Sequence, residues 1–211
     1  LRAKLRLSKQ KAYAIRADEK YLKNLISDLP FGLTGSQEKS LKEILSDVSR
    51  GWPMNRLLQG DVGSGKTIVA ALAALMAAKN GKQAVFMAPT EILASQHYSI
   101  FKKFFPGFSG GVALLTSSNA KVFYGDGLET ELDKKDLIKK IASGEMKIIV
   151  GTHSLISSSG GARSVSFNDL ALVIIDEQHR FGVKQRAQLT GRKDGNGKTL
   201  PHFLSMSATP I

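Results

Sequence analysis

Apolar and polar residues alternate along this chain in blocks that have the lengths of strands and helices. Short apolar runs predict strands at residues 55–59, 84–88, 112–116, 147–150, 171–175 and 202–206. Longer segments between most of these runs predict helices at residues 66–79, 91–104, 133–143 and 183–190. Strands that alternate with helices are typical of βαβ units, so we expect an α/β fold with a mostly parallel sheet and helices on both faces. Right-handed crossovers would then place the loops after the strands along one edge, where ligands bind.

The first part of the chain has a different pattern. Residues 1–28 carry apolar positions at mixed helical spacing and predict a helical extension, which ends before Pro30 because proline disfavours helix in the preceding residue. A second helix is expected from Ser36 to Val48. Three further stretches are polar or rich in glycine and predict loops, at residues 117–132, 157–168 and 191–199.

The composition narrows the classes of protein that remain. The 211 residues contain no cysteine, which excludes a disulfide framework or a cysteine-based zinc site and is compatible with a cytoplasmic location. The longest apolar runs are too short to span a bilayer, so we expect no membrane partner. Lys and Arg number 30 against 18 Asp and Glu, and the net charge of +12 favours nucleic acid as a partner. The chain begins with Leu1 and stops just after Pro210, so we expect a piece of a longer protein.

The most specific motif is a phosphate-binding loop that joins a predicted strand to a predicted helix. It fits G-x-x-x-x-G-K-[ST] in full and consists of Gly60, Asp61, Val62, Gly63, Ser64, Gly65, Lys66 and Thr67. The glycines let backbone N–H groups approach a phosphate at the positive end of the following helix. Lys66 is expected to reach the β- and γ-phosphates, and the Thr67 hydroxyl is expected to ligate Mg²⁺. The motif therefore predicts a site for ATP with Mg²⁺.

Two adjacent carboxylates follow the predicted strand at residues 171–175. Asp176 would hold Mg²⁺, directly or through water, and Glu177 would orient and deprotonate the attacking water. An acidic pair in a surface turn is the plain alternative. The complete phosphate loop and the apolar strand before the pair favour the catalytic interpretation.

Several runs together resemble the RecG branch of superfamily-two DNA helicases, and they occur in the order of that family. They lie at residues 29–37, 53–59, 88–94, 150–153, 176–183 and 206–210. By this resemblance, residues 29–211 are identified as the first RecA-like motor lobe, a P-loop NTPase domain, and residues 1–28 as an N-terminal extension or linker. Residues 114–118 match a DNA-contact run of the family only loosely, and residues 121–132 are longer than its usual connection.

The resemblance also implies roles for single residues. Gln37 would read the adenine edge, Phe31 would stack near the base, and Gln178 and His179 would complete the ATPase motif that begins at Asp176. The resemblance implies DNA-backbone contact or coupling for Pro89, Thr90, Glu91, Gly151, Thr152, His153, Ser207, Ala208 and Thr209. Thr90 can also be a helix N-cap, which is compatible with phosphate binding. For His179 a packed polar residue is the alternative to coupling between the ATP site and DNA.

The function implied by the resemblance is that of a bacterial, cytoplasmic motor. The intact protein would use ATP to translocate on double-stranded DNA and remodel stalled forks and Holliday junctions. A second motor lobe with arginine fingers and a wedge domain for branched DNA would lie outside this chain. Two alternatives stay open: a transcription-repair coupling translocase, against which Gln178 argues, and a DNA-binding module with an idle phosphate loop, against which the intact Lys66 and Glu177 argue.

Overall fold

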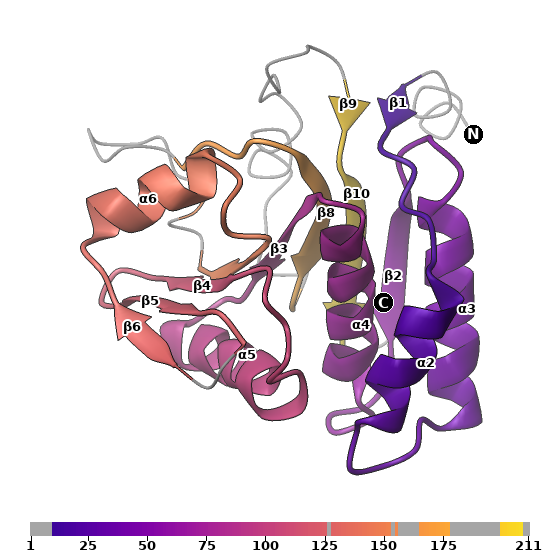
Figure 1. The fold of residues 1–211 in the computed structure, drawn as a ribbon. Coiled ribbons are helices and arrows are strands. Elements are labelled where there is room, and N and C mark those ends of the chain that lie inside the picture. Colours follow the sequence, from indigo (N-terminus) through magenta and orange to yellow (C-terminus); the bar gives the residue numbers. More distant parts are fainter. Residues whose placement is uncertain (1–9, 126–127, 153–154, 156–164, 178–198, 209–211) are drawn as a thin grey trace.

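A computed structural model describes residues 10–125, 128–152, 155, 165–177 and 199–208 of the chain (Figure 1). Its centre is an eight-stranded sheet in the order β2-β10-β8-β3-β7-β4-β5-β6. The strands are β2 (Asn55–Gln59), β3 (Gln83–Met87), β4 (Val112–Leu115), β5 (Ala120–Phe123), β6 (Glu129–Glu131), β7 (Ile148–Gly151), β8 (Leu170–Ile175) and β10 (His202–Ser207). All neighbours from β2 to β4 in this order pair parallel, and β5 and β6 add an antiparallel edge. The predicted mostly parallel sheet is confirmed.

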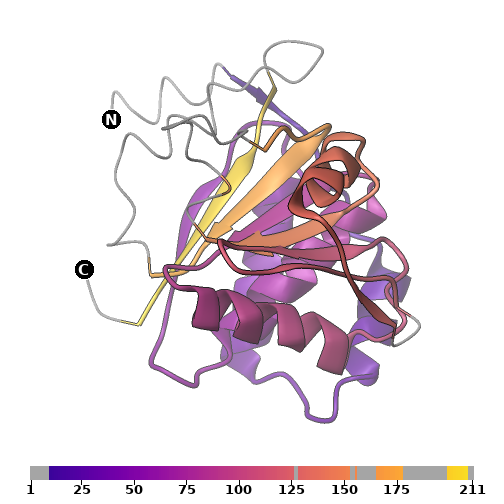
Figure 2. The same ribbon diagram turned by 90° about the vertical axis from the view of Figure 1, so that its left-hand side faces the viewer.

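Helices cover both faces of the sheet, as expected (Figure 1, Figure 2). They are α2 (Glu19–Ser27), α3 (Gly35–Val48), α4 (Lys66–Lys79), α5 (Glu91–Phe104) and α6 (Lys134–Ala142). Side chains from α3, α4 and α5 form one core cluster with Phe86 and Ile174, whereas α6 packs on the opposite face with Val85 and Val173. Neighbouring residues of β3 and of β8 thus serve different cores, because successive strand side chains point to opposite faces.

The helix that follows the phosphate loop is the most deeply buried one in the described part of the chain. Every residue of α4 from Ile68 to Ala78 is buried. A helix that is apolar on all sides requires neighbours on all sides, and here β3 and β8 lie beneath it while α3 and α2 cover it. The start of α4 is therefore held firmly at the edge of the sheet.

The N-terminal region differs from the prediction. In place of a helix through residues 1–28, residues 11–12 form the short strand β1 (Lys11–Ala12), which pairs parallel with β9 (Thr199–Leu200). Helix α2 begins only at Glu19, where the Asp18 side chain accepts the Tyr21 N–H and caps it. Before this cap the extended backbone bonds to the end of α3 and the turn after it, from Ala12 N to Gly51 O and from Ile15 N to Val48 O. These tertiary hydrogen bonds hold the segment extended, although its apolar spacing favours a helix.

The predicted loop at residues 117–132 was also wrong, because it contains β5 and β6. Strand β5 pairs antiparallel with β4, and Val122 is buried in the core. The exposed, polar strand β6 forms the sheet edge, where Lys121 of β5 makes cross-strand ion pairs with Glu129 and Glu131. Residues 1–9 and the predicted helix at 183–190 lie outside the described residues, as do most of the predicted loops at 157–168 and 191–199.

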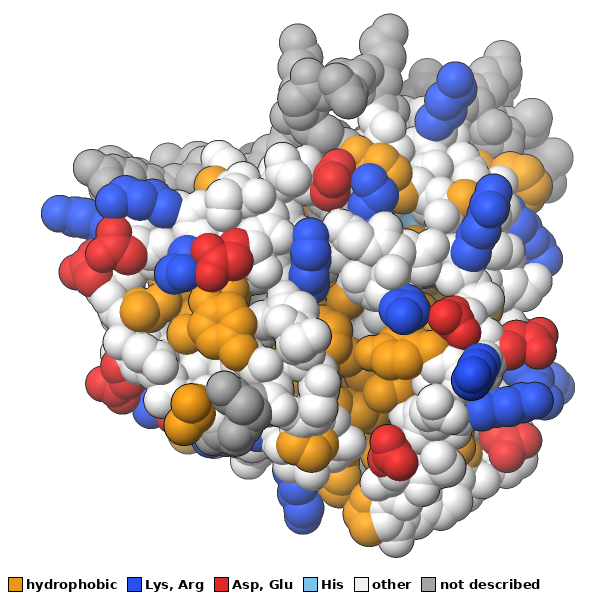
Figure 3. All heavy atoms as spheres, in the orientation of Figure 1, with side chains coloured by type: hydrophobic (Ala, Val, Ile, Leu, Met, Phe, Trp, Pro, Cys, Tyr) orange, Lys and Arg blue, Asp and Glu red, His pale blue; other side chains and the backbone are white. Residues whose placement is uncertain are grey.

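No helix in the described ranges is both long and apolar enough to cross a bilayer. On the face drawn in Figure 3, basic and acidic side chains lie interspersed and do not form a single patch of one sign. The net positive charge alone therefore does not mark a DNA-binding surface on this face.

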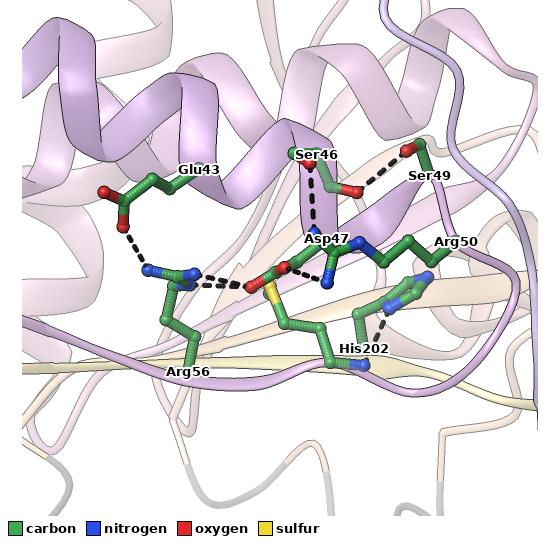
Figure 4. Close-up of polar contacts among 8 residues, drawn as sticks. Glu43, Ser46, Asp47, Ser49, Arg50, Arg56 and His202 are labelled. Carbon is green, nitrogen blue, oxygen red and sulfur yellow. Dashed lines mark hydrogen bonds and ion pairs between the residues drawn. The ribbon is translucent and has the colours of Figure 1, made fainter. Parts of the chain in front are cut away.

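Polar contacts join α3 to strand β2, which leads into the phosphate loop (Figure 4). The Arg56 guanidinium donates to Asp47 Oδ2 at 2.7 and 2.9 Å and to Glu43 Oε2 at 2.6 Å. Arg50 reaches the other oxygen of Asp47 at 3.2 Å. Such partly exposed pairs contribute at most about 1 kcal/mol each. Their effect is to set the position of α3 against β2.

The buried His202 connects the N-terminal segment to the start of β2, the end of that strand away from the phosphate loop. His202, which is labelled in Figure 4, is fully buried; it accepts the Met54 N–H at Nδ1 (3.0 Å) and donates from Nε2 to the Tyr13 carbonyl (2.7 Å). Burial lowers the pKa of His202, partly opposed by the bond to Tyr13 and the charge of Asp47. If Nδ1 also carried a proton, two hydrogen-bond donors, Nδ1–H and the Met54 N–H, would face each other.

We expect His202 to make the fold less stable in mild acid. Because its folded pKa lies below the ordinary value of about 6.5, the unfolded chain takes up the proton first. The stability contribution is complete above that value and is lost as the pH falls through the folded pKa. Urea unfolding between about pH 8 and about pH 5 should therefore show a smaller pH dependence for His202→Gln, which keeps a donor and an acceptor but cannot ionise. An equal pH dependence in both proteins would contradict this assignment.

Candidate functional site

The predicted motifs meet at one edge of the sheet. They follow the carboxyl ends of strands that run parallel: the phosphate loop follows β2, residues 88–91 follow β3, Thr152 follows β7, Asp176 and Glu177 follow β8, and Ala208 follows β10. The register is fixed by backbone bonds, from Gly60 N to Ser207 O at 3.3 Å and from Asp176 N to Met87 O at 2.9 Å. Since β10 lies between β2 and β8, the phosphate loop and the carboxylate pair are separated by one strand.

The phosphate loop has the backbone conformation that its glycines allow. Gly63 and Gly65 have φ angles of 82° and 79°, in the left-handed region that favours glycine. Gly65 is the N-cap of α4 and provides no side-chain cap. The positive end of this buried helix is thus open to an anion, as the motif requires.

Lys66 is held against the loop itself. Its Nζ donates to the carbonyl oxygens of Gly60 (2.5 Å) and Asp61 (2.8 Å). The ammonium group is thereby placed at the loop whose backbone is expected to bind the phosphates. A triphosphate would offer this ammonium stronger, charged acceptors than the two carbonyls.

Gln37 contacts the phosphate loop directly. It forms a capping box with Thr34 at the start of α3, and its Nε2 also donates to the Ser64 carbonyl at 2.8 Å. A Cβ added at Gly65 would collide with the Gln37 amide nitrogen. The structure therefore brings the residue expected to read adenine next to the loop expected to bind phosphate. Phe31, which is 41% exposed, packs edge-on against Phe104 with ring centroids 5.4 Å apart.

Both carboxylate oxygens of Asp176 have hydrogen-bond partners. Oδ1 accepts the Glu177 N–H at 3.0 Å, and Oδ2 lies 2.8 Å from Nε2 of His97 on α5. Glu177 has a φ angle of 53°, a left-handed conformation that costs a residue other than glycine roughly 1–2 kcal/mol. Such strain is found where surrounding structure over-determines a functional residue.

His97 is a site residue that the sequence analysis missed. It lies in a helix that carries several other polar residues, and no local motif distinguishes it from them. Only the fold brings α5 beside the end of β8.

The described residues that are predicted to contact DNA lie at the same edge, but they differ in exposure. Thr90 is exposed and caps α5 through the Leu93 N–H. Thr152 and Ser207 are buried, at 8% and 2% exposure, and Pro89 and Ala208 are partly buried. Four predicted site residues lie outside the described residues: His153, Gln178, His179 and Thr209.

The carboxylate of Glu91 faces a neighbouring loop of the protein. It accepts the Ser117 N–H at 3.0 Å and the Ser118 hydroxyl. The bonds from Ser118 and Ser117 lower the pKa of Glu91 below its ordinary value. Glu91 therefore ties the loop after β4 to the start of α5, a contact that the sequence analysis did not predict.

Thr67 and Asp176 have the chemistry that Mg²⁺ requires. Hydroxyl and carboxylate oxygens are hard donors, and Mg²⁺ usually takes one or two protein ligands together with phosphate oxygens and water. Among the described residues, no group of three or more His, Asp or Glu could hold a metal ion by itself. Thr67 and Asp176 would supply one or two ligands to a Mg²⁺ ion that also binds phosphate oxygens.

The profile of the DEAD/DEAH box helicase family matches residues 34–211. The chain belongs to this family. It is 49% identical over 208 residues to the ATP-dependent DNA helicase RecG of Aquifex aeolicus, which covers 99% of this chain and 24% of the relative. The RecG of Bacillus subtilis is 46% identical over 196 residues, which covers 93% of this chain and 26% of the relative. The predicted resemblance to RecG helicases is confirmed.

Solved structures agree with the fold. A structure of RecG bound to a three-way DNA junction matches with a TM-score of 0.79 at 37% identity, over 100% of this chain and 25% of that one. The UvsW helicase of bacteriophage T4 matches with a TM-score of 0.56 at 17% identity, over 92% of this chain and 62% of that one, which supports the fold alone. The predicted RecA-like α/β fold is confirmed. The chain spans about a quarter of the length of these RecG relatives.

Gly151 should be intolerant of a side chain. A Cβ at this position would collide with the Leu115 carbonyl of the neighbouring strand and with the Leu155 side chain. Because the strand backbone cannot move aside, we expect Gly151→Ala to lower the free energy of unfolding by about 1–3 kcal/mol, the usual cost of overpacking. Gly107→Ala is the matched control, since nothing lies within 4 Å of its added Cβ. Equal melting temperatures for the two variants would contradict the close approach of Gly151 to the Leu115 carbonyl.

Proposed function

We propose that this chain is the ATP-binding motor lobe of a RecG-type DNA helicase. In the intact protein, ATP hydrolysis would drive translocation on DNA and remodel stalled forks and Holliday junctions during recombination and repair. The observation that carries the proposal is the meeting of the phosphate loop, Gln37 and the Asp176–Glu177 pair at one edge of a parallel sheet. The relatives are bacterial enzymes that act on DNA, so we place its action in the bacterial cytoplasm.

Each residue at this edge has a role that its position supports. The backbone of residues 60–65 and the start of α4 would bind the phosphates, with Lys66 on the β- and γ-phosphates. Gln37 would bind the adenine edge, next to the loop that it already contacts. Thr67 and Asp176 would hold Mg²⁺, which neutralises charge as the phosphoryl group leaves, and Glu177 would take the proton of the attacking water.

The DNA track would run along the same edge, past the ends of β3, β7 and β10. Thr90 is exposed at the start of α5, and a hydroxyl group at a helix start suits phosphate oxygens, whose contacts position a strand without reading its sequence. We assign Glu91 to holding the Ser117–Ser118 loop, because a carboxylate repels phosphate. A second motor lobe and a wedge domain, elsewhere in the intact protein, would complete the ATP site and recognise the branch point.

A lobe of a transcription-repair coupling translocase would share much of this architecture. Similarity to RecG over 99% of the chain favours the RecG-type function. A DNA-binding module with an idle phosphate loop is less consistent with the site, because Lys66, Thr67, Asp176 and Glu177 are all present at the edge where hydrolysis requires them.

Nucleotide binding should depend on Lys66. Replacing it with alanine removes a charged contact to phosphate worth about 1.5–3 kcal/mol, so we expect Lys66→Ala to weaken the binding of Mg²⁺–ATP by at least about 10-fold. Isothermal titration calorimetry with a slowly hydrolysed ATP analogue would measure this. Lys79→Ala, at the far end of the same helix, is the matched control and should bind like the unaltered chain. Equal affinity of all three proteins for the ATP analogue would contradict the proposed binding of ATP at the phosphate loop.

ATP turnover by this chain alone should be very slow. Arginine fingers from a second lobe are worth about 10³–10⁵ in rate in related phosphoryl transfer. We therefore expect turnover far below about 1 s⁻¹, the lower end of the usual range for complete enzymes, with or without forked DNA at low salt. Turnover at or above that rate would mean that the lobe needs no partner for catalysis.

A further inference from the structure

We propose that His97 is a positioning residue for Asp176, and that it sets the affinity of the nucleotide site for Mg²⁺. The proposal deepens the function proposed above and rests on the magnesium role of Asp176 given there. It starts from the contact between His97 Nε2 and Asp176 Oδ2, at 2.8 Å.

This contact holds the second oxygen of the Asp176 carboxylate. An ionised carboxylate only accepts hydrogen bonds, so Nε2 is the donor. Oδ1 already accepts the Glu177 N–H, so the two bonds together prevent the carboxylate from rotating. The remaining lone pairs of both oxygens then point in directions set by the protein. Outer partners of this kind orient metal ligands and influence metal affinity.

The histidine ring is itself held in place. His97 is 5% exposed, and its ring packs on Phe86 of β3 with centroids 4.5 Å apart. Burial strengthens a hydrogen bond to a charged group, because little water competes for it. The donor therefore has a fixed position and direction.

Packing alone does not account for a histidine here. Its second nitrogen, Nδ1, is buried and has no hydrogen-bond partner among the described residues. A buried nitrogen without a partner costs stability, whereas a phenylalanine or leucine would fill the same apolar space without that cost. What the histidine adds is the Nε2 bond to Asp176.

The position of His97 also connects the carboxylate to a helix at the DNA edge. His97 lies about two turns along α5 from Thr90, the cap of that helix. The start of α5 is expected to meet the DNA backbone. Movement of this helix would therefore move the donor that orients Asp176.

Three variants separate the hydrogen bond from packing. His97→Phe keeps an aromatic ring on Phe86 but removes the donor. His97→Gln can place an amide nitrogen near the position of Nε2, whereas His97→Asn is too short to reach Asp176. The measurement is the binding of a fluorescent ADP analogue to the 211-residue chain, first with a metal chelator and then over a Mg²⁺ titration.

We expect His97→Phe and His97→Asn to raise the Mg²⁺ concentration at half-maximal effect by about 10-fold or more, the usual cost of losing an outer partner of a metal ligand. Affinity in the presence of chelator should not change. His97→Gln should restore the Mg²⁺ response. Because each variant is compared with itself with and without metal, a general loss of stability does not produce this pattern.

Asp176→Asn distinguishes failure of this inference from failure of the proposed function. If Asp176→Asn shifts the Mg²⁺ response and neither His97→Phe nor His97→Asn does, the positioning role is overturned. Weaker binding to the same degree with and without Mg²⁺ would make His97 a packing residue only, and would also overturn it. If none of the variants shifts the response, Asp176 does not serve Mg²⁺, and both proposals fail together. Should His97→Phe not fold, His97→Asn against His97→Gln decides the same question.

Discussion

Parallel pairing of the strands from β2 to β4 is the constraint on which the site depends. Because these strands point the same way, segments far apart in the chain end at one edge, where Gly60 bonds to Ser207 and Asp176 bonds to Met87. Both faces of β3 and β8 are buried under different helices, so a shift of one residue would place the wrong side chains in each core. The hydrophobic register therefore also determines where the phosphates and the carboxylates can meet.

Buried polar side chains form hydrogen bonds at both the amino and the carboxyl ends of the strands in this sheet. At the amino ends of the strands, Gln83 bonds to Ile141 O, Met146 O and Asn168 N, and His202 joins Met54 to Tyr13. Each of these contacts holds a connection between elements, and satisfied buried groups of this kind specify one arrangement. At the carboxyl ends the corresponding contact is His97 with Asp176, which leaves Nδ1 unpaired among the described residues. A buried group that lowers stability without improving the packing is typical of functional sites.

Helix α5 lies between the expected DNA track and the expected magnesium site. Thr90 at its start belongs to the expected DNA track, and Glu91 beside it holds the Ser117–Ser118 loop. His97 in the same helix touches the expected magnesium carboxylate. A single packed helix thus links the two. Helix α3 forms a comparable link between Asp47 near its end, which binds Arg56 of β2, and Gln37 near its start, which contacts the phosphate loop.

The sequence by itself determined the phosphate loop, the Asp176–Glu177 pair and the alternating strands and helices, because each is a pattern of neighbouring residues. It did not determine β1, which is two residues long and pairs with β9 far along the chain, or the short strands β5 and β6. Nor did it determine the partners of the site residues. Gln37 and Ser64 are 27 positions apart, His97 and Asp176 are 79 apart, and Met54 and His202 are 148 apart. Only the tertiary structure decided these contacts, since a side-chain hydrogen bond needs atoms within about 3 Å, and spacing along the chain says nothing of that distance until the sheet has formed.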